Sequence, residues 1–202
     1  MEEDKDDEEI LEQEFDDVRK KAYDVAKMML CDRGYGVHET EYDPSEPPSR
    51  IVLVLVATDQ FDTINVYMAP EEKQLGKGYV QEILGLNGDD YNHIIIITRC
   101  GLTSYVTKEM SAQKKCIVEV FKYDELQAAV GRHSLVPKYS VVPEKMVGDL
   151  MRRFRCEKKE DLPRMLSSDP VARYFHFTPG TVLELVHNIP DWPGLVYYRV
   201  VI

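Results

Sequence analysis

Hydrophobic positions repeat at helical spacing near the N-terminus. Between Ile10 and Leu30 the apolar residues recur at intervals that place them on one face of a helix. They are Ile10, Leu11, Phe15, Val18, Ala22, Val25, Ala26, Met29 and Leu30. The sequence RGYG at 33–36 follows, and we predict that a glycine there caps the helix. The proline-rich stretch 43–50 then predicts a loop.

The middle of the chain alternates between short apolar runs and amphipathic stretches. Four runs rich in β-branched residues predict strands at 50–59, 63–70, 91–100 and 116–122. Three other stretches predict helices at 76–88, 103–115 and 123–131. Strands that alternate with helices are typical of α/β layer structures. We therefore predict an α/β domain with a mixed sheet.

The pattern changes near Arg132, where we place the border between two modules. Residues 132–145 are extended and contain prolines. Residues 143–156 predict a helix that starts at a proline and carries basic residues in its last turns, which suits the helix dipole. This helix ends in the run RRFR at 152–155, where we expect Phe154 to be buried. Nucleic acid binding by the same run is the alternative.

The last part of the chain predicts a small α+β module. A connector at 158–169 leads to a helix start signal, with Asp169 as N-cap and Pro170 as the first helical residue. Two alternating runs at 181–187 and 194–202 predict a pair of strands joined by a hairpin-like loop.

Charge sets the N-terminal end apart from the rest. The formal net charge is −11, and Met1 to Asp17 hold eleven acidic residues and one lysine. The remainder has 25 acidic and 24 basic residues, so it is nearly neutral. We expect an acidic tail at 1–9, an α/β domain at 10–131 and the small module at 132–202. Self-repulsion would keep such a tail solvated, and binding of a basic partner is the alternative.

Composition indicates a soluble intracellular protein. No apolar run is long enough to cross a bilayer, and the acidic N-terminus is the opposite of a signal peptide. We therefore expect no membrane partner. The four cysteines, Cys31, Cys100, Cys116 and Cys156, lack metal-site spacing. The first three lie in or beside apolar runs, which predicts reduced, buried thiols.

No catalytic centre emerges from the sequence. Gln81 stands where a dinucleotide fingerprint would need its third glycine after Gly76 and Gly78. The chain has no nucleophile elbow, and its five histidines share no metal-ligand spacing. We expect no catalytic residue, no metal, no cofactor and no small-molecule substrate.

A metal-dependent nuclease remains open as an alternative, because a mixed sheet can carry such a site. It would need an aspartate and an acid-x-lysine pair on adjacent strands. Glu71 and Glu157 begin acid-x-lysine matches, but both lie in predicted loops or helix edges. Asp59 and Asp62 are the residues whose replacement would test this alternative.

Several short signatures near the C-terminus occur in register with a known family. They are HSLVPKYSVV from His133, LPRMLSSDPVARYFHFTPGTVLELV from Leu162, and YYRVVI from Tyr197. They resemble the C-terminal assembly module of the fifth shared subunit of eukaryotic nuclear RNA polymerases, a module that archaeal RNA polymerases carry as a separate small protein. The matching residues are His133, Leu135, Val136, Pro137, Leu162, Pro163, Asp169, Pro170, Val171, Ala172, Gly180, Val182, Tyr198 and Arg199.

The first module is similar to the jaw domain of the same eukaryotic subunit in the order of its elements. The residues that carry this likeness are Arg33-Gly34-Tyr35, Val66, Gly76-Lys77, Ile94 to Ile97, Gly101-Leu102-Thr103 and Glu119. The archaeal protein lacks this domain, so the two-module layout favours a eukaryotic or eukaryotic-virus polymerase. The chain departs from the family at Ser104, Ser134, Tyr139 and the tryptophan-bearing loop. A specialised paralogue and a viral homologue both stay open.

The resemblance implies a noncatalytic subunit that acts in transcription within RNA polymerase. Its C-terminal module would dock on the largest subunit, among other polymerase subunits, and its jaw module would lie beside downstream double-stranded DNA. The implied contacts with the large subunit are His133, Leu135, Val136, Pro137, Lys138, Asp169, Pro170, Val171, Arg173, Tyr174, Gly180, Tyr198 and Arg199. The implied DNA-proximal residues are Arg99, Thr103, Ser104 and Lys108.

The implied location is the nucleus, or a viral factory or virion for a viral homologue. A stand-alone transcription regulator that uses the module to bind the polymerase is the alternative function.

Overall fold

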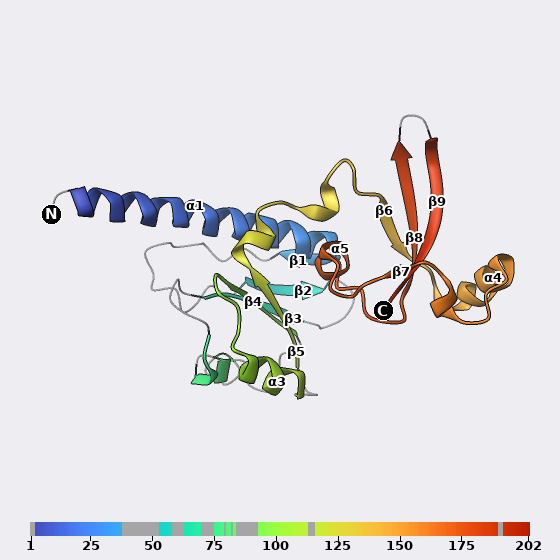
Figure 1. Ribbon diagram of the computed structural model, residues 1–202, viewed down its shortest axis with the longest axis horizontal. Helices are drawn as coiled ribbons and strands as arrows, with labels where there is room; N and C mark the ends of the chain where they lie inside the picture. The colour runs from blue at the N-terminus through green and yellow to red at the C-terminus, as the bar shows by residue number, and fades with distance from the viewer. Residues whose placement is uncertain are drawn as a thin grey trace. The chain divides into compact units, whose positions relative to one another are not determined.

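The chain divides into two compact units, Met1–Ala128 and Ala129–Ile202, each with its own sheet (Figure 1). The computed structural model describes residues 3–37, 53–57, 63–69, 75–78, 80–81, 83, 93–112, 116–189 and 192–202. Within these residues, no helix is long and apolar enough to span a membrane.

The N-terminal unit begins with the long helix α1, Glu3–Asp32, which confirms the helix predicted from apolar spacing. From Glu3 onward the acid-rich end is part of this helix, because glutamates are good helix formers and acids suit a helix N-terminus. The helix ends where the Arg33 N–H donates to the Met29 carbonyl at 3.0 Å. Gly34 follows with φ +91°, a conformation that favours glycine, so the predicted glycine cap is confirmed.

Within the described residues the first sheet has five strands in the order β1-β2-β3-β4-β5. They are β1 Tyr35–Val37, β2 Leu53–Ala57, β3 Thr63–Met68, β4 His93–Thr98 and β5 Ile117–Lys122. The pairs β1–β2 and β2–β3 are antiparallel, whereas β3–β4 and β4–β5 are parallel. The predicted mixed sheet is therefore confirmed, and the three-residue strand β1 is an addition to it.

Helix α3, Ser104–Ala112, confirms the prediction at 103–115, and residues 77–78, 80–81 and 83 are helical within the stretch predicted at 76–88. The helix predicted at 123–131 is wrong. Two short 3₁₀ turns, η1 Tyr123–Leu126 and η2 Val130–Arg132, occupy that stretch.

Tertiary contacts explain the lost helix. The buried Tyr123 hydroxyl donates to the Ala69 carbonyl at 2.8 Å. The Gln127 side-chain amide donates to the carbonyls of Tyr123, at 2.9 Å, and Val18, at 3.1 Å. These bonds tie the segment to the end of β3 and to α1, and they outweigh its modest helix propensity.

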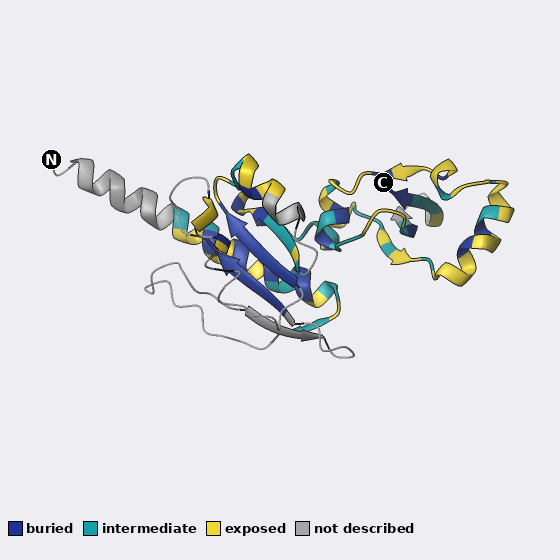
Figure 2. Cartoon of the chain, turned by 90° about the horizontal axis from the view of Figure 1, so that it is seen from below, coloured by how far each residue is buried: buried dark blue, intermediate teal, exposed yellow. Residues whose placement is uncertain are grey.

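The core of the N-terminal unit lies on its central strands, and every residue of β4 is buried (Figure 2). Helix α1 contributes Ala22, Val25, Ala26, Met29 and Leu30 to the buried set. The expectation of buried thiols is wrong for two cysteines, because Cys31 and Cys100 are exposed. Cys31 follows the core-facing Leu30 on α1, and Cys100 lies beyond the end of β4. Cys116 is half-buried.

The C-terminal unit is built on a second sheet. Among the described residues it has four strands in the order β6-β8-β9-β7. They are β6 Lys138–Val141, β7 Arg164–Met165, β8 Val182–Ile189 and β9 Trp192–Val201. Pairs β6–β8 and β8–β9 are antiparallel, and β7–β9 is parallel. Its helices are α4 Glu144–Phe154, η3 Lys159–Asp161 and α5 Pro170–Tyr174, so the unit is α+β.

The structure differs from the prediction in two segments of this unit. The stretch 158–169, predicted as a plain connector, contains strand β7, which pairs with Val200 and Val201 of β9. The predicted strand pair also extends further, because Asn188 pairs with Pro193 and Ile189 with Trp192. A register shift at His187/Asn188 allows the strand pairing to continue into residues that were predicted as the connecting loop.

The second sheet buries a different cluster on each face. Met165, Val171, Ala172, Leu183, Leu185 and Val201 form the cluster under α5. Val147, Leu150, Leu162, Val182 and Val200 form the cluster under α4. Because side chains alternate along a strand, Val200 of β9 packs in the cluster under α4 and its neighbour Val201 packs in the cluster under α5.

Candidate functional site

Helix α5 begins at the signature Asp169-Pro170. The Asp169 Oδ1 atom accepts a hydrogen bond from the Val171 N–H at 2.9 Å, and Pro170 occupies the first turn. The predicted N-cap is therefore confirmed. Val171 and Tyr174 are only 8% and 2% exposed, so their side chains pack inside the unit. Asp169 and Pro170 thus position α5, while Arg173 lies half-buried on it.

The signature 133–138 leads into the edge of the sheet. Leu135 is 79% exposed, and its N–H donates to His133 Nδ1 at 3.2 Å. Val136 packs against the cluster under α5, and Pro137 is half-buried. Lys138 is exposed and opens β6, which is an edge strand of the sheet.

Two neighbouring signature residues, Tyr198 and Arg199, lie on opposite faces of β9. The Arg199 guanidinium lies 5.8 Å from the Tyr197 ring centroid, and its Nε atom is buried without a hydrogen-bond partner among the described residues. Tyr198 packs against the α4 cluster instead. Gly180 has φ +88° and donates its N–H to the Val201 carbonyl at 2.9 Å, closing the turn before β8.

The Tyr198 hydroxyl donates to Glu184 Oε2 at 2.8 Å. This bond raises the pKa of Tyr198 above its usual value of 10.0, and burial and the charge of Glu184 raise it further. Burial is the main cause of the raised pKa of Tyr139 on β6. Both hydroxyls therefore stay protonated and can donate hydrogen bonds at neutral pH.

The implied partner contacts do not form one continuous surface. Val136, Val171 and Arg199 belong to the α5 face, whereas Tyr198 belongs to the α4 face. The expectation that Phe154 is buried is wrong, because this side chain is 49% exposed. It lies at the end of α4 with its ring centroid 5.6 Å from that of Tyr198.

The sequence reasoning missed an aromatic cluster beside α5. The rings of Phe175 and Phe177 stack at 5.3 Å, and Tyr139 lies 6.3 and 6.1 Å from them. The signal was the spacing of aromatic residues in YFHF at 174–177. Tyr139, one of the positions at which the chain departs from the family it resembles, packs within this cluster.

The implied DNA-proximal residues surround the start of α3 in the N-terminal unit. Arg99 follows β4 and is exposed, and Ser104 and Lys108 are exposed on α3. Thr103 is half-buried, and its carbonyl accepts from the Thr107 N–H at 3.0 Å. The Arg99 guanidinium lies 5.2 Å from the Phe15 ring centroid, so this side chain also packs against α1.

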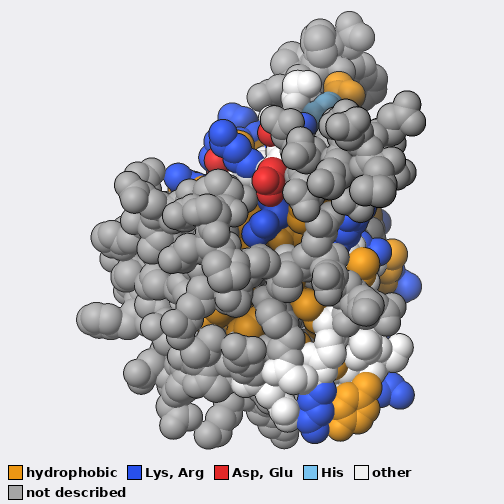
Figure 3. Space-filling view, turned by 90° about the vertical axis from the view of Figure 1, so that its left-hand side faces the viewer, with side chains coloured by type: hydrophobic (Ala, Val, Ile, Leu, Met, Phe, Trp, Pro, Cys, Tyr) orange, Lys and Arg blue, Asp and Glu red, His pale blue; other side chains and the backbone are white. Residues whose placement is uncertain are grey.

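The sequence did not predict that Lys77 and Tyr105 lie together near these residues. Tyr105 on α3 is 61% exposed, and the Lys77 Nζ atom lies 5.5 Å from its ring centroid and 3.5 Å from its hydroxyl. Figure 3 shows basic side chains beside a large apolar one at the lower edge of this face, the level of α3 in Figure 1. Two lysines, an arginine and an exposed ring around one helix start are suited to phosphate contact.

A buried ionic cluster lies elsewhere in the same unit. Both Glu119 carboxylate oxygens accept from the Arg33 guanidinium, at 2.7 and 3.0 Å. Glu119 Oε1 also lies 2.6 Å from His93 Nε2. These side chains are 3–12% exposed and join the end of α1 to strands β4 and β5.

The nuclease alternative finds no support in the described part of the chain. Glu157 lies on the connector after α4, and Lys159 donates to Glu144 Oε1 at 2.8 Å. Asp59, Asp62 and Glu71 lie outside the described residues.

Comparison with known proteins identifies the C-terminal unit. Residues 128–201 match the family model of the RNA polymerase Rpb5 C-terminal domain. The resemblance to the fifth shared subunit of eukaryotic RNA polymerases is thereby confirmed.

Polymerase subunits are similar to most of the chain. The DNA-directed RNA polymerases I, II, and III subunit rpabc1 of Dictyostelium discoideum is 29% identical over 180 residues, which cover 85% of the chain and 90% of that protein. The subunit RPABC1 of Caenorhabditis elegans is 28% identical over 193 residues, covering 86% and 90%. The similarity therefore reaches well into the N-terminal unit.

A plant polymerase subunit covers a similar share of the chain. The DNA-directed RNA polymerases IV and V subunit 5B of Arabidopsis thaliana is 27% identical over 188 residues, covering 86% of the chain and 84% of that protein. These three relatives are subunits of DNA-directed RNA polymerases, so the chain resembles proteins that act in transcription as parts of a complex.

Proposed function

We propose that the chain is a noncatalytic subunit of a multisubunit DNA-directed RNA polymerase. The observation that carries this proposal is the Rpb5 C-terminal domain at 128–201, together with polymerase subunits that align along most of the chain. In this proposal residues 10–131 form the jaw module, 132–202 form the assembly module, and the protein works in the nucleus. A viral homologue would work in a viral factory or virion.

The assembly module docks on the largest polymerase subunit in this proposal. The exposed Leu135 and Lys138, the edge strand β6 and the turn at Gly180 are among the accessible parts of the family signature. An edge strand presents unpaired backbone groups that a partner can pair with. The buried Val171 and Tyr174 support this surface from within, and the half-buried Asp169 with the exposed Pro170 sets the start of α5.

Purification of the tagged full chain from its native host tests this function. We expect the two large polymerase subunits at equal stoichiometry with the chain, measured by quantitative mass spectrometry, and their identity names the polymerase. Polymerase at a small fraction of one copy would favour a stand-alone regulator instead. Recovery of no polymerase chain would overturn the proposal.

The jaw module lies beside downstream DNA in this proposal, with Arg99 and Lys108 near the phosphates. Replacing both with glutamate is expected to weaken retention of a downstream duplex by the purified complex and to reduce its salt dependence. Each lost phosphate contact removes counterion release, which lowers the slope of log affinity against log salt by about 0.9. Fluorescence anisotropy of a labelled duplex across a salt titration measures this slope.

The matched control reverses Lys20 and Lys21, two exposed lysines of α1, and changes net charge equally. Subunit assembly should be unaffected in both variants. An unchanged salt slope in the Arg99/Lys108 variant, or an equal loss in the control, would count against DNA contact at this turn.

A further inference from the structure

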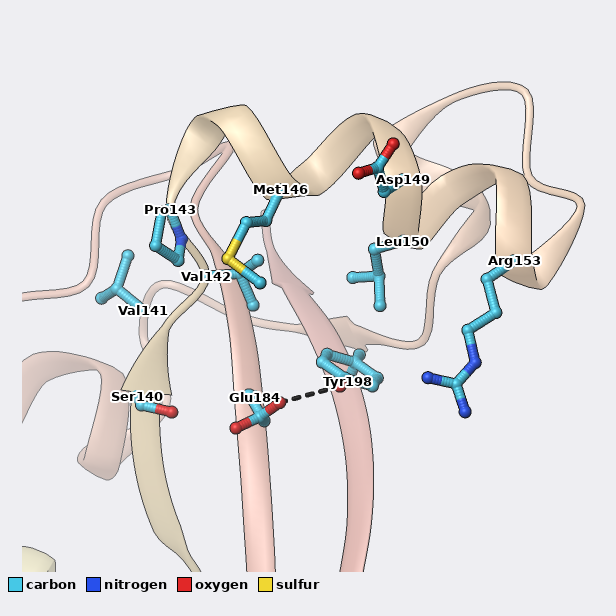
Figure 4. Close-up of a pocket in the computed structure, with 10 residues that line it drawn as sticks. All are labelled: Ser140, Val141, Val142, Pro143, Met146, Asp149, Leu150, Arg153, Glu184 and Tyr198. Atoms are coloured by element: carbon cyan, nitrogen blue, oxygen red, sulfur yellow. Dashed lines mark hydrogen bonds between the residues drawn. The ribbon is translucent and has the colours of Figure 1, made fainter.

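The C-terminal unit has an open pocket of about 340 Å³ between α4 and the second sheet. Figure 4 shows Met146 and Leu150 pointing from α4 into it, with Tyr198 and Glu184 on the strands below. Val141 and Met146 on its rim are each 54% exposed. Phe154 does not line the pocket, but its ring contacts that of Tyr198, and its side chain is 49% exposed. Helix α4 packs on Val182 and Val200 of the sheet. The next cross-strand pair on this face, Glu184 and Tyr198, lines the pocket instead.

The walls of the pocket carry the Glu184 carboxylate as an acceptor and the Arg153 guanidinium as a donor, beside the Ser140 hydroxyl. Glu184 uses Oε2 to accept from Tyr198, and among the described residues its other oxygen has no hydrogen-bond partner. Arg153 extends from the end of α4, and its charge acts on Tyr198, but in the described part of the chain it makes no hydrogen bond or ion pair (Figure 4). Asp149 is already paired with Arg152. The two remaining charges have opposite sign, so the site complements a dipolar, uncharged group.

The edge strand β6 passes the mouth of the pocket. Ser140 and Val141 of β6 line it, and the ladder continues where the Val142 N–H donates to the Val182 carbonyl at 2.9 Å. In an antiparallel ladder alternate residues bond inward, so the backbone groups of Val141 point away from β8. A chain that lies along this edge would meet backbone donors and acceptors and then the apolar pocket.

We propose that this pocket binds an extended segment of another polymerase chain, with one large uncharged side chain of that segment inserted between Met146 and Tyr198. Backbone groups of the segment meet Glu184, Arg153 and the free edge of β6, as in strand-addition complexes that use a side-chain pocket for specificity. The inference rests on the proposed function, because it takes the partner to be a polymerase chain. It makes α4 and β6 a second part of the docking surface, separate from the face of α5.

Two single substitutions, Met146→Asp and Val141→Glu, test the pocket in the tagged full chain. Each places a charge on an exposed apolar rim, so the fold should persist, and circular dichroism with thermal unfolding checks this. We expect each variant to recover at least tenfold less of the largest polymerase subunit than the unchanged chain. Met146→Leu should keep full recovery. Leu166→Asp is the matched control, since Leu166 is 59% exposed on the same unit and does not line the pocket.

The outcomes distinguish a failure of the pocket proposal from a failure of the proposed function. If the unchanged chain recovers polymerase and both charged variants do so equally, the pocket proposal is overturned while the proposed function stands. If Leu166→Asp loses polymerase as strongly, the effect is not specific to the pocket and the proposal is likewise overturned. If the unchanged chain recovers no polymerase, the proposed function fails first.

A crosslinking experiment identifies the occupant directly. With p-benzoylphenylalanine in place of Met146, irradiation of the purified complex should join this position to one segment of a large polymerase subunit. Mass spectrometry of the crosslinked peptide should locate an aliphatic or aromatic residue at the site. A crosslink to a second copy of the chain, with a dimer in light scattering, would overturn the proposal in favour of self-association.

Discussion

Replacing Glu119 with alanine is expected to lower the free energy of unfolding of the N-terminal unit by about 3–5 kcal/mol. The loss follows from the charge that the change leaves behind. The Arg33 side chain is 3% exposed and makes two bonds to Glu119, and the His93 side chain is 9% exposed beside the same carboxylate. Without Glu119, the guanidinium stays buried after losing two hydrogen bonds to a carboxylate, so less of its desolvation cost is offset.

Urea unfolding of the full chain, followed by circular dichroism, measures this loss, and hydrogen exchange locates it. We expect faster exchange in β4 and β5 and unchanged exchange in the C-terminal unit. Asp149→Ala is the control, since it removes an ion pair whose side chains are 73–81% exposed, and it should cost less than about 1 kcal/mol. A loss at Glu119 no larger than that at Asp149 would show that the buried cluster does not hold the unit together.

Gly131→Ala is expected to destabilise the C-terminal unit by about 1–3 kcal/mol through overpacking. A methyl group at this position would lie 2.7 Å from both Tyr174 Cε1 and Phe175 Cζ, which is closer than carbon atoms approach without a shift. Tyr174 is 2% exposed, and its ring makes an edge contact with Phe175 at 5.0 Å. Because both rings are held by their neighbours, the strain has to move α5 or the η2 turn.

Gly148→Ala provides a control with the opposite sign. Gly148 lies inside α4, and an added Cβ would meet no atom within 4 Å. Alanine there should stabilise the helix by about 0.5–1 kcal/mol, because glycine loses more backbone entropy on folding. Urea midpoints of the two variants should therefore move in opposite directions. A Gly131→Ala variant at least as stable as the unchanged chain would contradict the close packing against α5.

The sequence predicted the elements whose signals are local. The apolar spacing of α1, the β-branched runs of β3 and β4, and the Asp169-Pro170 start of α5 each depend on residues close together in the chain. The family signature was also readable, because its short motifs keep their order from His133 to Arg199. These features need no knowledge of what packs against them.

Tertiary structure decided the features that depend on distant residues. The stretch 123–131 failed to form an α-helix because Tyr123 and Gln127 bond to the end of β3 and to α1. Strand β7 exists only because β9, more than thirty residues away, offers it a partner. The exposure of Cys31 and of Phe154 likewise follows from which helix face meets a sheet.

The candidate sites divide in the same way. The sequence alone determined that residues 132–202 carry a polymerase-subunit signature. It could not place Tyr198 and Arg199 on opposite faces, join Arg33 to Glu119 and His93, or reveal the pocket beneath α4. Those arrangements arise when strands pair and helices pack, because only then do side chains far apart in sequence share one environment.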